Sequence, residues 1–482
     1  MKTKRYIHAL AGLGLASAMY AQAPFSLDTT FRTYIQDQYV NSLVVLPSGD
    51  LLLSGAIHFP GDLSTRYLAK IDGEGSQVLS FPFGYGGGKL TPWNDRFYVA
   101  VGQSIARVLA SGAGDASFIQ PDADPYFSSM QGGDYHVYPD GRVLMSGAHT
   151  LNDVQRGFVG NYNLIWFSNQ GYLDTTRVHR KGNGVVYNFA ELPDSGFICS
   201  GTCTQFDGIP VGRIFRTDAD GIPDPSFQSD VYTGRAFTYL PLTDGRIYTG
   251  GNFRRNANPL DTLRLVRFMP DGSLDPTFTM PQFAYDELIY PLGPTIGKVT
   301  PYMDGKLFIM GDFQYVNGQS RRGICVIDSA GALMNDFDGC GVGVFTYMGL
   351  ASSTVQGIAP YDDEHWIIWG GYTGYNDGTT NDTLQRFVTR LHVGDITTGV
   401  ASTTKEPLFN LYPNPSSGSV TLALGQVPKS ATLLVRDALG RVVQRQRVSD
   451  HYTTLTLASS GVYAVELWSN SERVAVERVV VE

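Results

Sequence analysis

The chain has few charged residues and, beyond its N-terminus, no long hydrophobic run. Charged residues make up 17% of its 482 residues, and the formal net charge is −9. An acidic chain without a basic stripe is poorly suited to nucleic-acid binding. No segment has the roughly 20 consecutive apolar residues that a membrane-spanning helix needs. The sequence therefore predicts neither a nucleic-acid partner nor a transmembrane segment.

Motifs that would mark a catalytic centre are also missing. The sequence contains no G-x-S-x-G, no H-E-x-x-H and no glycine-rich phosphate loop, and its eight histidines are scattered. An enzyme needs several groups that converge on one place. We therefore predict no catalytic residue and interpret His136, His149 and His365 as hydrogen-bonding residues of the scaffold.

Cysteine is scarce as well, with four residues in the chain. If the protein is exported, Cys199, Cys203, Cys325 and Cys340 allow three pairings. A Cys325–Cys340 disulfide would close a short loop and is the expected pair. Cys199 and Cys203 could bond only across a sharp turn, because an extended strand would hold them about 13 Å apart. Zinc is disfavoured because Cys-x3-Cys has no second ligand pair at finger spacing.

Glycine and aromatic residues are abundant instead. The 55 glycines and the 12% of aromatic residues favour many turns and half-buried strands over long helices. The sequence therefore predicts an all-β protein.

The first 23 residues read as a secretory signal peptide. Lys2, Lys4 and Arg5 precede an apolar run, which ends at the small-x-small pattern Ala21-Gln22-Ala23. Removing 1–23 takes away three basic residues and no acids, so the net charge moves to about −12. The mature chain is then acidic and exported.

A short motif recurs between residues 24 and 396. "DGSLDPTF" at 271–278 has copies at 25–31, 114–118, 171–176 and 221–227, a worn copy at 335–337 and a doubtful one at 75–81. A strand-like stretch ending in glycine, such as "LTDGRIYTGG", recurs every 46 to 60 residues. These stretches end at Gly55, Gly147, Gly201, Gly251, Gly311 and Gly371, and Val101 fills the remaining place.

Each unit therefore reads as strand, Asp-Gly hairpin, strand, variable loop and strand. Seven such units predict a seven-bladed β-propeller over 24–396, with a solenoid of the same units as the alternative. The strand near Phe25–Phe31 is expected to complete the last blade. The closing glycines would allow a bulge or a close backbone approach.

The octapeptide at 271–278 could be a metal loop, an acid site or a turn. Because the motif repeats, we interpret it as a joint between blades. Gly272 would supply the turn and Asp275 would accept backbone hydrogen bonds. Phe278 would fill the gap between neighbouring blades. Function is then expected in loops that do not repeat.

The motif pair "DGSLDPTF" and "PDGRVLMSG" resembles the delta-60 repeat β-propeller family over about residues 25–395. The resemblance implies the fold and no established chemistry. An acidic turn around Asp218, Asp220 and Asp224 could hold calcium, but its residues also match the turn of the other repeats. We therefore expect no cofactor and no metal.

A Ser/Thr-rich linker at 397–407 separates the repeats from a module of about seven short strands at 408–482, read as a small Ig-like sandwich. The module resembles the type A C-terminal sorting domain of the type IX secretion system of Gram-negative bacteria. The matching residues are Tyr412, Pro413, Asn414, Pro415, Gly418, Gly440, Gly461 and Tyr463. The resemblance implies export by the type IX secretion machinery to the cell surface or the medium.

Two functions remain open on the sequence alone. The first is a secreted or surface-anchored, non-catalytic propeller that binds an extracellular glycan, peptide or protein through loops. The candidate aromatic residues are Trp93, Phe253, Tyr315, Tyr372 and Tyr375, each of which could instead pack between blades. The second is a polysaccharide hydrolase or lyase with its site in the central funnel, by analogy of fold only.

Overall fold

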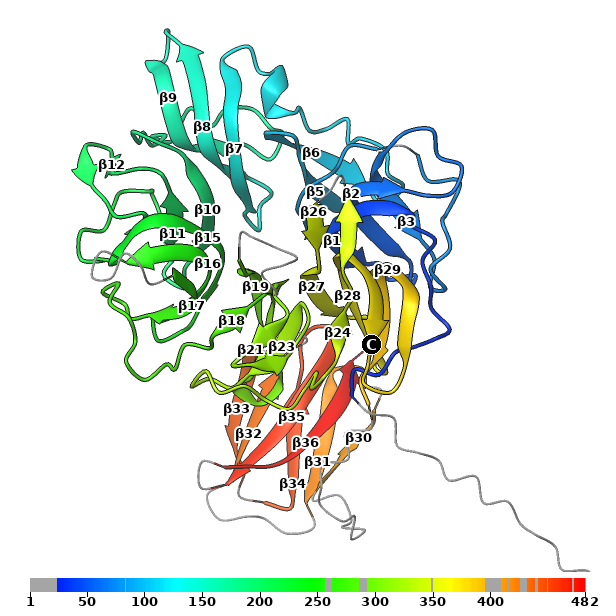
Figure 1. Ribbon diagram of the computed structural model, residues 1–482. Helices are drawn as coiled ribbons and strands as arrows, with labels where there is room; N and C mark the ends of the chain where they lie inside the picture. Colours follow the sequence, from blue (N-terminus) through cyan, green and yellow to red (C-terminus); the bar gives the residue numbers. More distant parts are fainter. Residues whose placement is uncertain are drawn as a thin grey trace, which may run out of the picture. The chain divides into compact units, whose positions relative to one another are not determined.

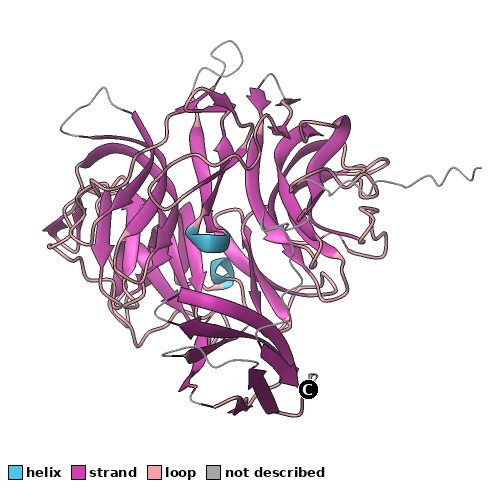
Figure 2. Cartoon of the chain, turned by 90° about the horizontal axis from the view of Figure 1, so that it is seen from below, coloured by secondary structure: helices cyan, strands magenta, loops and turns pink. Residues whose placement is uncertain are grey.

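The computed structural model describes residues 24–82, 84–255, 262–285, 293–347, 350–394, 409–414, 416–424, 431–437, 441–448, 450–469 and 472–481. The predicted signal peptide and linker lie outside these residues. The chain divides into two compact units, Met1–Ile396 and Thr397–Glu482. The described structure is almost all β, with two single-turn 3-10 helices, η1 (Pro121–Ala123) and η2 (Met303–Gly305) (Figure 2). The predicted all-β class is confirmed.

Seven antiparallel sheets follow one another in the described part of the first unit. The first four are β1 (Asp37–Val45), β2 (Leu51–His58), β3 (Arg66–Ile71); β4 (Leu90–Trp93), β5 (Arg96–Val101), β6 (Ser104–Leu109); β7 (Phe127–Val137), β8 (Val143–Asp153), β9 (Phe158–Phe167); and β10 (Val186–Glu191), β11 (Phe197–Gly201), β14 (Ile214–Thr217). The next three are β15 (Val231–Pro241), β16 (Ile247–Arg255), β17 (Thr262–Phe268); β19 (Thr295–Pro301), β20 (Leu307–Asp312), β23 (Ile324–Ile327); and β27 (Thr354–Pro360), β28 (His365–Asn376), β29 (Asn381–His392) with β24 (Gly341–Val342).

Short strands decorate the loops between these sheets. They are β12 (Gln205–Phe206), β13 (Ile209–Pro210), β18 (Phe283–Ala284), β21 (Tyr315–Val316), β22 (Gln319–Ser320), β25 (Phe345–Tyr347) and β26 (Leu350–Ser352). They fall where the sequence repeats vary in length, so the variable loops carry their own small hairpins.

The seven sheets are arranged around a ring (Figure 1). The first strand of each sheet packs against neighbouring sheets, and β1 packs against β27 and β28 of the last sheet. The segment that precedes β1 pairs with β29, through a bridge between Leu27 and Leu391 and hydrogen bonds from Phe25 N to His392 O and from Asp28 N to Arg390 O. The expected completion of the last sheet by the N-terminal segment is therefore confirmed.

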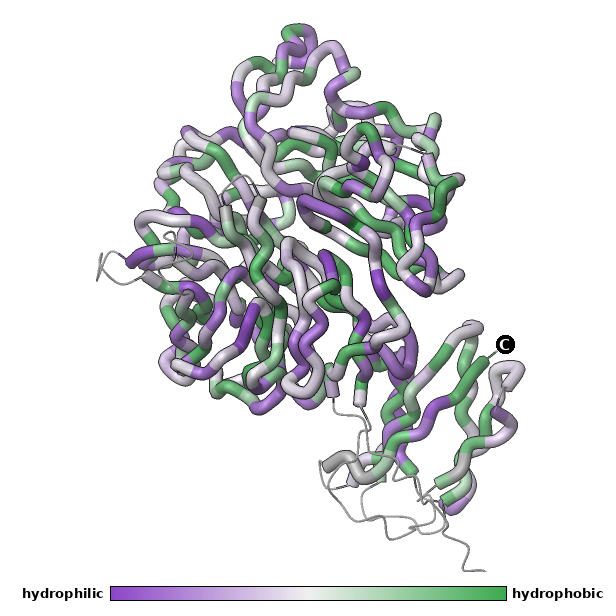
Figure 3. The backbone as a smooth tube through the Cα atoms, turned by 45° about the vertical axis from the view of Figure 1, so that its right-hand side comes forward, coloured by the Kyte–Doolittle hydropathy of each residue, from purple (hydrophilic) through white to green (hydrophobic). Residues whose placement is uncertain are grey.

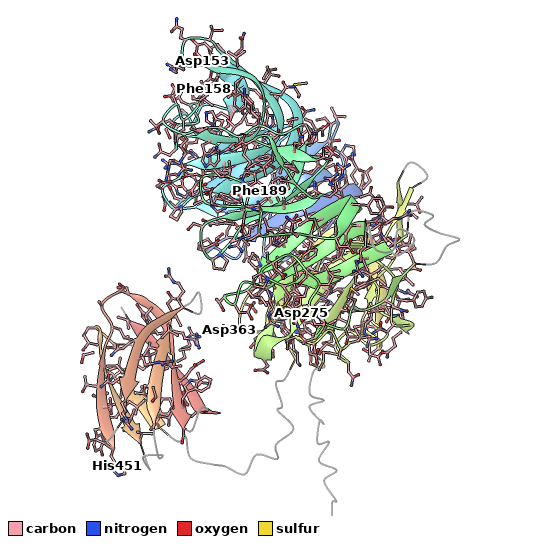
Figure 4. All side chains as sticks on the ribbon, turned by 90° about the vertical axis from the view of Figure 1, so that its left-hand side faces the viewer. Asp153, Phe158, Phe189, Asp275, Asp363 and His451 are labelled. Carbon is pink, nitrogen blue, oxygen red and sulfur yellow. The ribbon has the colours of Figure 1, made fainter. Side chains whose placement is uncertain are left out.

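The "DGSLDPTF" motif is a joint between sheets, as predicted. Asp275 Oδ1 accepts hydrogen bonds from Thr277 N and Oγ1, and Asp275 Oδ2 accepts one at 2.7 Å from Arg267 Nε of β17. The Arg267 guanidinium also donates to the carbonyl oxygen of Ser329, in the turn that follows β23 of the next sheet. Phe278 is 6% exposed in a core shared by these two sheets. Figure 4 labels Asp275 at this joint.

Gly272 of the same motif contacts the end of the preceding motif copy. Its φ is +86°, and a Cβ on it would lie 2.8 Å from the backbone of Gln228, the residue after the previous motif. Gln228 N in turn donates to Asp271 O. Glycine is required here because a left-handed turn must also approach a neighbouring backbone. The end of this motif copy therefore packs against the next sheet, and its glycine turn contacts the end of the copy before it.

Two of the other copies repeat this chemistry. Arg107 Nε donates to Asp115 Oδ2 at 2.7 Å and Arg107 Nη1 donates to Asn169 O of the next sheet at 2.6 Å. Arg390 Nε donates to Asp28 Oδ2 at 2.6 Å and Arg390 Nη1 donates to Gly73 O at 2.7 Å. Gly73 follows β3, so this copy joins the last sheet to the first.

The second unit consists of two antiparallel sheets. One has the order β30 (Phe409–Tyr412), β31 (Ser419–Leu424), β34 (Tyr452–Thr456), and the other has β33 (Val442–Arg447), β32 (Thr432–Arg436), β35 (Gly461–Ser469), β36 (Glu472–Val481). Residues of both sheets, such as Leu422 and Val465, share one core. Apolar stretches run along strands in each unit (Figure 3).

The expected Cys325–Cys340 disulfide is wrong, because all four cysteines are free thiols. Cys325 lies on β23, where side chains alternate between the two faces. Its side chain packs with the core that contains Phe278, whereas Ile324, Val326 and Cys340 pack with the core on the other side. The sulfur of Cys340 instead donates to Asp338 O. Sequence spacing alone could not show that Cys325 and Cys340 lie on opposite faces of the sheet.

Candidate ligand-binding site at the inner strands

A bulge interrupts the first strand of six of the seven sheets, opposite the recurring glycine. In β1, for example, Val40 pairs with Gly55 and Ser42 with Ser54, which leaves Asn41 unpaired. Corresponding register shifts in the other bulged sheets leave these residues without a cross-strand partner: Asp134, Tyr187, Phe237, Gly297 and Gln356. In the third sheet Gly133, next to Asp134, is unpaired as well. We call Asn41, Asp134, Tyr187, Phe237, Gly297 and Gln356 the bulge residues.

The recurring glycines face these bulges, and the bulged backbone of the first strand of each sheet, its inner strand, comes too close to them for a side chain. A Cβ on Gly55, or on its counterparts Gly147, Gly201, Gly251, Gly311 and Gly370, would lie between 1.8 and 2.4 Å from a carbonyl oxygen of the inner strand. In the second sheet Val101 replaces the glycine and the pairing of β4 with β5 has no register shift. The expected role of these glycines is thus confirmed, and the bulges re-aim a side chain in five of the six bulged sheets, since Gly297 has none.

Bulge residues of neighbouring sheets meet one another. The guanidinium of Arg235 lies 4.4 Å from the ring centre of Tyr187 and 5.2 Å from that of Phe237. Gln356 Oε1 approaches to 4.0 Å the place where a Cβ would lie on Gly297. The bulge residues therefore form a surface on the inner strands that differs from sheet to sheet, whereas the joints repeat.

A cavity of about 440 Å³ between the fifth and sixth sheets is lined by joint residues, including Arg246 and Arg267. Another cavity of about 300 Å³ opens where the first and last sheets meet. Its lining carries no charged side chain and consists of Gln38, Tyr39, Asn41, Phe345, Ser352, Thr354, Gln356 and Gly371. Phe345 and Ser352 come from the hairpin β25–β26, and Tyr39 is 43% exposed. We call this cavity the amide pocket.

Hydrogen bonds fix part of the amide pocket and leave part of it free. Ser352 Oγ donates to Gly371 O at 3.0 Å, and Gln38 Nε2 donates to Thr65 Oγ1 at 3.2 Å. Within the described residues, neither the Tyr39 hydroxyl nor the Gln356 amide has a hydrogen-bond partner inside the protein. These two groups are therefore available to a ligand.

Charged residues gather on the inner strands of other sheets. Lys89 Nζ donates to Asp134 Oδ1 at 3.0 Å. Desolvation, followed by repulsion from Lys89, lowers the pKa of Lys298. Lys298 lies on β19 of the sixth sheet, and Lys89 directly precedes β4 of the second sheet. The ionisation of Lys298 is thus coupled to the charges of Lys89 and Asp134.

A histidine–carboxylate pair lies beside this charged group. His136 Nε2 and Glu191 Oε2 are 3.5 Å apart. Desolvation and the Lys89 charge lower the pKa of His136 to about 4, so the imidazole is neutral at pH 7. Desolvation raises the pKa of Glu191. The pair could exchange a proton with a ligand, which sequence analysis missed because the two residues lie in different repeats.

The structure places the other predicted residues in the scaffold. Tyr372, Tyr375 and Phe253 are fully buried, as the packing alternative for them anticipated. Trp93 donates to Pro139 O, whereas Tyr315 is 39% exposed. In the acidic turn, Asp218 accepts from the backbone of Asp220 and Ile222, and Asp224 from Ser226. These carboxylates therefore complete turns.

The sorting-motif residues of the second unit hold its ends together. Asn414 Nδ2 donates to Arg478 O at 2.7 Å and Asn414 Oδ1 accepts from Val480 N at 2.9 Å, which ties the segment after Tyr412 to β36. Tyr463 is 8% exposed and donates to Ser459 O.

The remaining sorting-motif residues divide between turns and undescribed segments. Pro413 follows Tyr412 through a cis peptide bond. Gly418 and Gly461 have φ of +107° and +154°. Pro415 and Gly440 lie outside the described residues.

Two family models match the chain. Residues 242–278 and 304–333 match a domain of unknown function, DUF5122, described as a beta-propeller. Residues 410–482 match the secretion system C-terminal sorting domain. The first unit is thus a β-propeller. The chain joins this propeller to a type IX C-terminal sorting domain, so the type IX machinery handles it and exports it to the cell surface or the extracellular space.

Comparison with solved structures adds distant similarities. The extracellular domain of a hybrid two-component system from B. thetaiotaomicron has 10% identity and a TM-score of 0.40; the alignment covers 96% of this chain but 59% of that one. PorZ, a surface component of the type-IX secretion system of Porphyromonas gingivalis, has 12% identity and a TM-score of 0.26, with coverage of 92% and 81%. No curated protein matches the chain. Among the described residues, no helix could cross a membrane.

Proposed function

We propose that the chain is an exported, non-catalytic binding protein whose amide pocket takes a neutral carbohydrate. In this proposal the seven sheets are the blades of one closed propeller, and the second unit is an Ig-like sandwich. The observation that carries the proposal is the lining of the amide pocket, which combines aromatic faces with uncharged hydrogen-bonding groups.

A sugar has apolar C–H faces and a rim of hydroxyl groups. The rings of Tyr39 and Phe345 offer surfaces for the C–H faces. The amide of Gln356 both donates and accepts, so it suits hydroxyls that do the same, and the amides of Gln38 and Asn41 keep their oxygens for a ligand while their nitrogens donate to Thr65 Oγ1 and Gly87 O. A charged ligand would find no counter-ion in this lining. The volume is at the low end of the range for small-molecule sites, of order 300 Å³.

Calorimetric titration of the mature chain, residues 24–482, with a panel of neutral glycans tests the proposal. We expect saturable binding of at least one glycan without turnover, weakened about tenfold or more by Tyr39→Ala, since buried aromatic contacts dominate such sites. Tyr172→Ala is the matched control because Tyr172 is also exposed, at 57%, and lies away from the pocket. Equal loss in both variants, or no binding, would contradict the proposal.

A polysaccharide hydrolase or lyase is a second candidate, favoured by the His136–Glu191 pair beside Asp134. Such reactions need a base and an acid in reach of one substrate. The neutral His136 and the Glu191 carboxyl offer both. Turnover of any glycan in the same panel, abolished by His136→Ala and retained in Tyr39→Ala, would favour the enzyme over the binding protein.

A further inference from the structure

Three potential metal ligands meet where the ring of sheets closes. Asp28 comes from the N-terminal segment, His365 from the start of β28 and His392 from the end of β29. One nitrogen or oxygen from each lies within 4.8 Å of the other two. Because the ligands lie near opposite ends of the first unit's sequence, no motif could reveal this cluster.

Backbone pairing fixes the three positions. His365 and His392 are direct cross-strand partners in the last sheet, and their ring centres are 4.9 Å apart. Asp28 is held beside them because Asp28 N donates to Arg390 O and His392 N donates to Ser26 O. The cluster therefore sits on paired strands, which place ligands more accurately than loops do.

The two histidines are peculiar to the closing sheet. In the fifth sheet the pairing of Ile247 with Phe268 places Arg246 and Met269 at the equivalent positions. Arg246 Nη1 lies 3.2 Å from Asp275, just as His365 Nε2 lies 3.6 Å from Asp28. The last sheet thus has His365 and His392 where the fifth sheet has Arg246 and Met269.

The state of His365 suits metal binding. Its Nδ1 lies 2.8 Å from Asp362 Oδ1. An ionised carboxylate can only accept, so Nδ1 donates to Asp362, and a metal ion would bind at Nε2, the nitrogen that faces Asp28. A carboxylate behind a histidine in this way is the usual second layer of a protein metal site, where it fixes the tautomer and strengthens the ligand.

We propose that Asp28, His365 and His392 bind one divalent transition-metal ion of the zinc class, which clamps the N-terminal segment to the last sheet. Imidazole nitrogens and a carboxylate are ligands that zinc accepts, with water in the fourth position. Ligand atoms about 2.0–2.1 Å from a tetrahedral zinc lie about 3.4 Å from each other. The 3.6 Å between His365 Nε2 and Asp28 Oδ2 is close to that spacing.

The surrounding charges allow a dication despite the nearby Arg390. Arg390 Nε donates to Asp28 Oδ2 at 2.6 Å, but a carboxylate oxygen has a second lone pair. Asp362 lies behind His365, and the Glu364 carboxylate acts electrostatically on His392. With Asp28 these give three carboxylates against one guanidinium.

The test uses the mature chain, residues 24–482, stripped with a chelator and titrated calorimetrically with ZnCl2. We expect one zinc ion per chain and a melting temperature that rises with zinc, because an ion that binds only the folded state stabilises it. Hydrogen exchange at the amides of Phe25, Asp28 and His392 should slow on binding, because these amides form the closure. Co²⁺ should give the absorption bands of a tetrahedral site, and Mg²⁺ should bind far more weakly.

Variants separate ligation from structure. His392→Ala and His365→Ala should each weaken zinc binding at least tenfold and abolish the slowed exchange, whereas His58→Ala, on β2 of the first sheet, should change neither. Circular dichroism confirms that each variant is folded, and His392→Gln, which keeps the volume without a strong ligand, provides a second test. No saturable zinc binding, or binding that survives the loss of both histidines, would overturn the proposal.

Discussion

The joints after β17 and after β23 occupy the same place in neighbouring sheets but use opposite chemistry. After β17, Arg267 and Asp275 form a buried ion pair, and Arg267 Nη1 donates to the Tyr248 hydroxyl at 2.8 Å. After β23, the equivalent positions hold Val326, Met334 and Phe308. Equivalent backbone hydrogen bonds, Asp275 N to Arg267 O and Met334 N to Val326 O, fix this correspondence.

What the two joints share is the aromatic plug. Phe278 is 6% exposed and Phe337 is 3% exposed. Phe337 stacks on Phe25 at 4.1 Å, in a core that also contains Phe308. Sheet-to-sheet packing therefore uses the aromatic plug in both joints, whereas the ion pair is one of two ways to fill the space behind it.

Removing half of the ion pair should destabilise the protein more than any other change at the two joints. Asp275→Ala leaves Arg267, whose side chain is 4% exposed, buried without its carboxylate. Such uncompensated buried charges cost about 3–5 kcal/mol. Urea titration of the variant should show this loss, and Asp271→Ala, at an exposed turn acid of the same motif, should stay within about 1 kcal/mol.

Removing the plug should cost slightly less, and equally in both joints. Phe278→Ala and Phe337→Ala should each lower the free energy of unfolding by about 3 kcal/mol or more, as large aromatic truncations in cores do. Urea titration measures both. If either variant loses less than about 1 kcal/mol of its free energy of unfolding, that ring does not stabilise the packing of its joint.

The joints were predictable from sequence because they repeat. The motif with Gly272, Asp275 and Phe278 recurs often enough for its acids to be read as turn-formers, and the structure gives each the predicted place. The partner Arg267 was not predicted, because it lies on β17 before the motif and is replaced in other repeats, for instance by Val326.

The ligand-facing residues of the inner strands were not predictable from sequence, because they are the residues that differ between repeats. Lys89, Asp134 and Lys298 lie in separate sheets, and the bulge between Gly132 and Tyr135 decides where Asp134 points. Strand periodicity alone cannot place a bulged side chain. The recurring glycine did carry a signal, since it marks the bulge, but the facing residue becomes evident only from the register.

Acid should reproduce part of the Asp275→Ala effect in the polar joints. Burial alone would raise the pKa of Asp275, but hydrogen bonds from Thr277 and Arg267 outweigh it and hold the pKa well below its usual range. The pKa of Asp115 is lowered for the same reasons. Because the folded pKa is depressed, this stability is complete above the unfolded value of about 3.9 and is lost as pH falls towards the folded value.

Urea midpoints at pH 6 and pH 3 measure this loss. It should be smaller than that of Asp275→Ala, because a protonated carboxyl keeps part of its hydrogen bonding. A midpoint that is unchanged or higher at pH 3 would contradict the assigned role of the joint carboxylates.

The smallest effect is expected when one joint is converted wholly into the other. The triple variant Tyr248→Phe, Arg267→Val, Asp275→Met copies the apolar joint after β23 into the position after β17. Replacing a complete buried ion pair by apolar residues that fill the space is often neutral. We therefore expect the free energy of unfolding to stay within about 1.5 kcal/mol of the parent, far above Asp275→Ala.

Solvent exposure makes this conversion tolerable. The Ser329 carbonyl, which loses its two donors, lies at an exposed turn and can be hydrated. Arg246 keeps its contact with Asp244. The variant should also lose part of the acid sensitivity, because the carboxyl that titrates is gone. A loss as large as that of Asp275→Ala would mean that the two joints are not interchangeable, and that the guanidinium bridge to the next sheet holds the fifth and sixth sheets together.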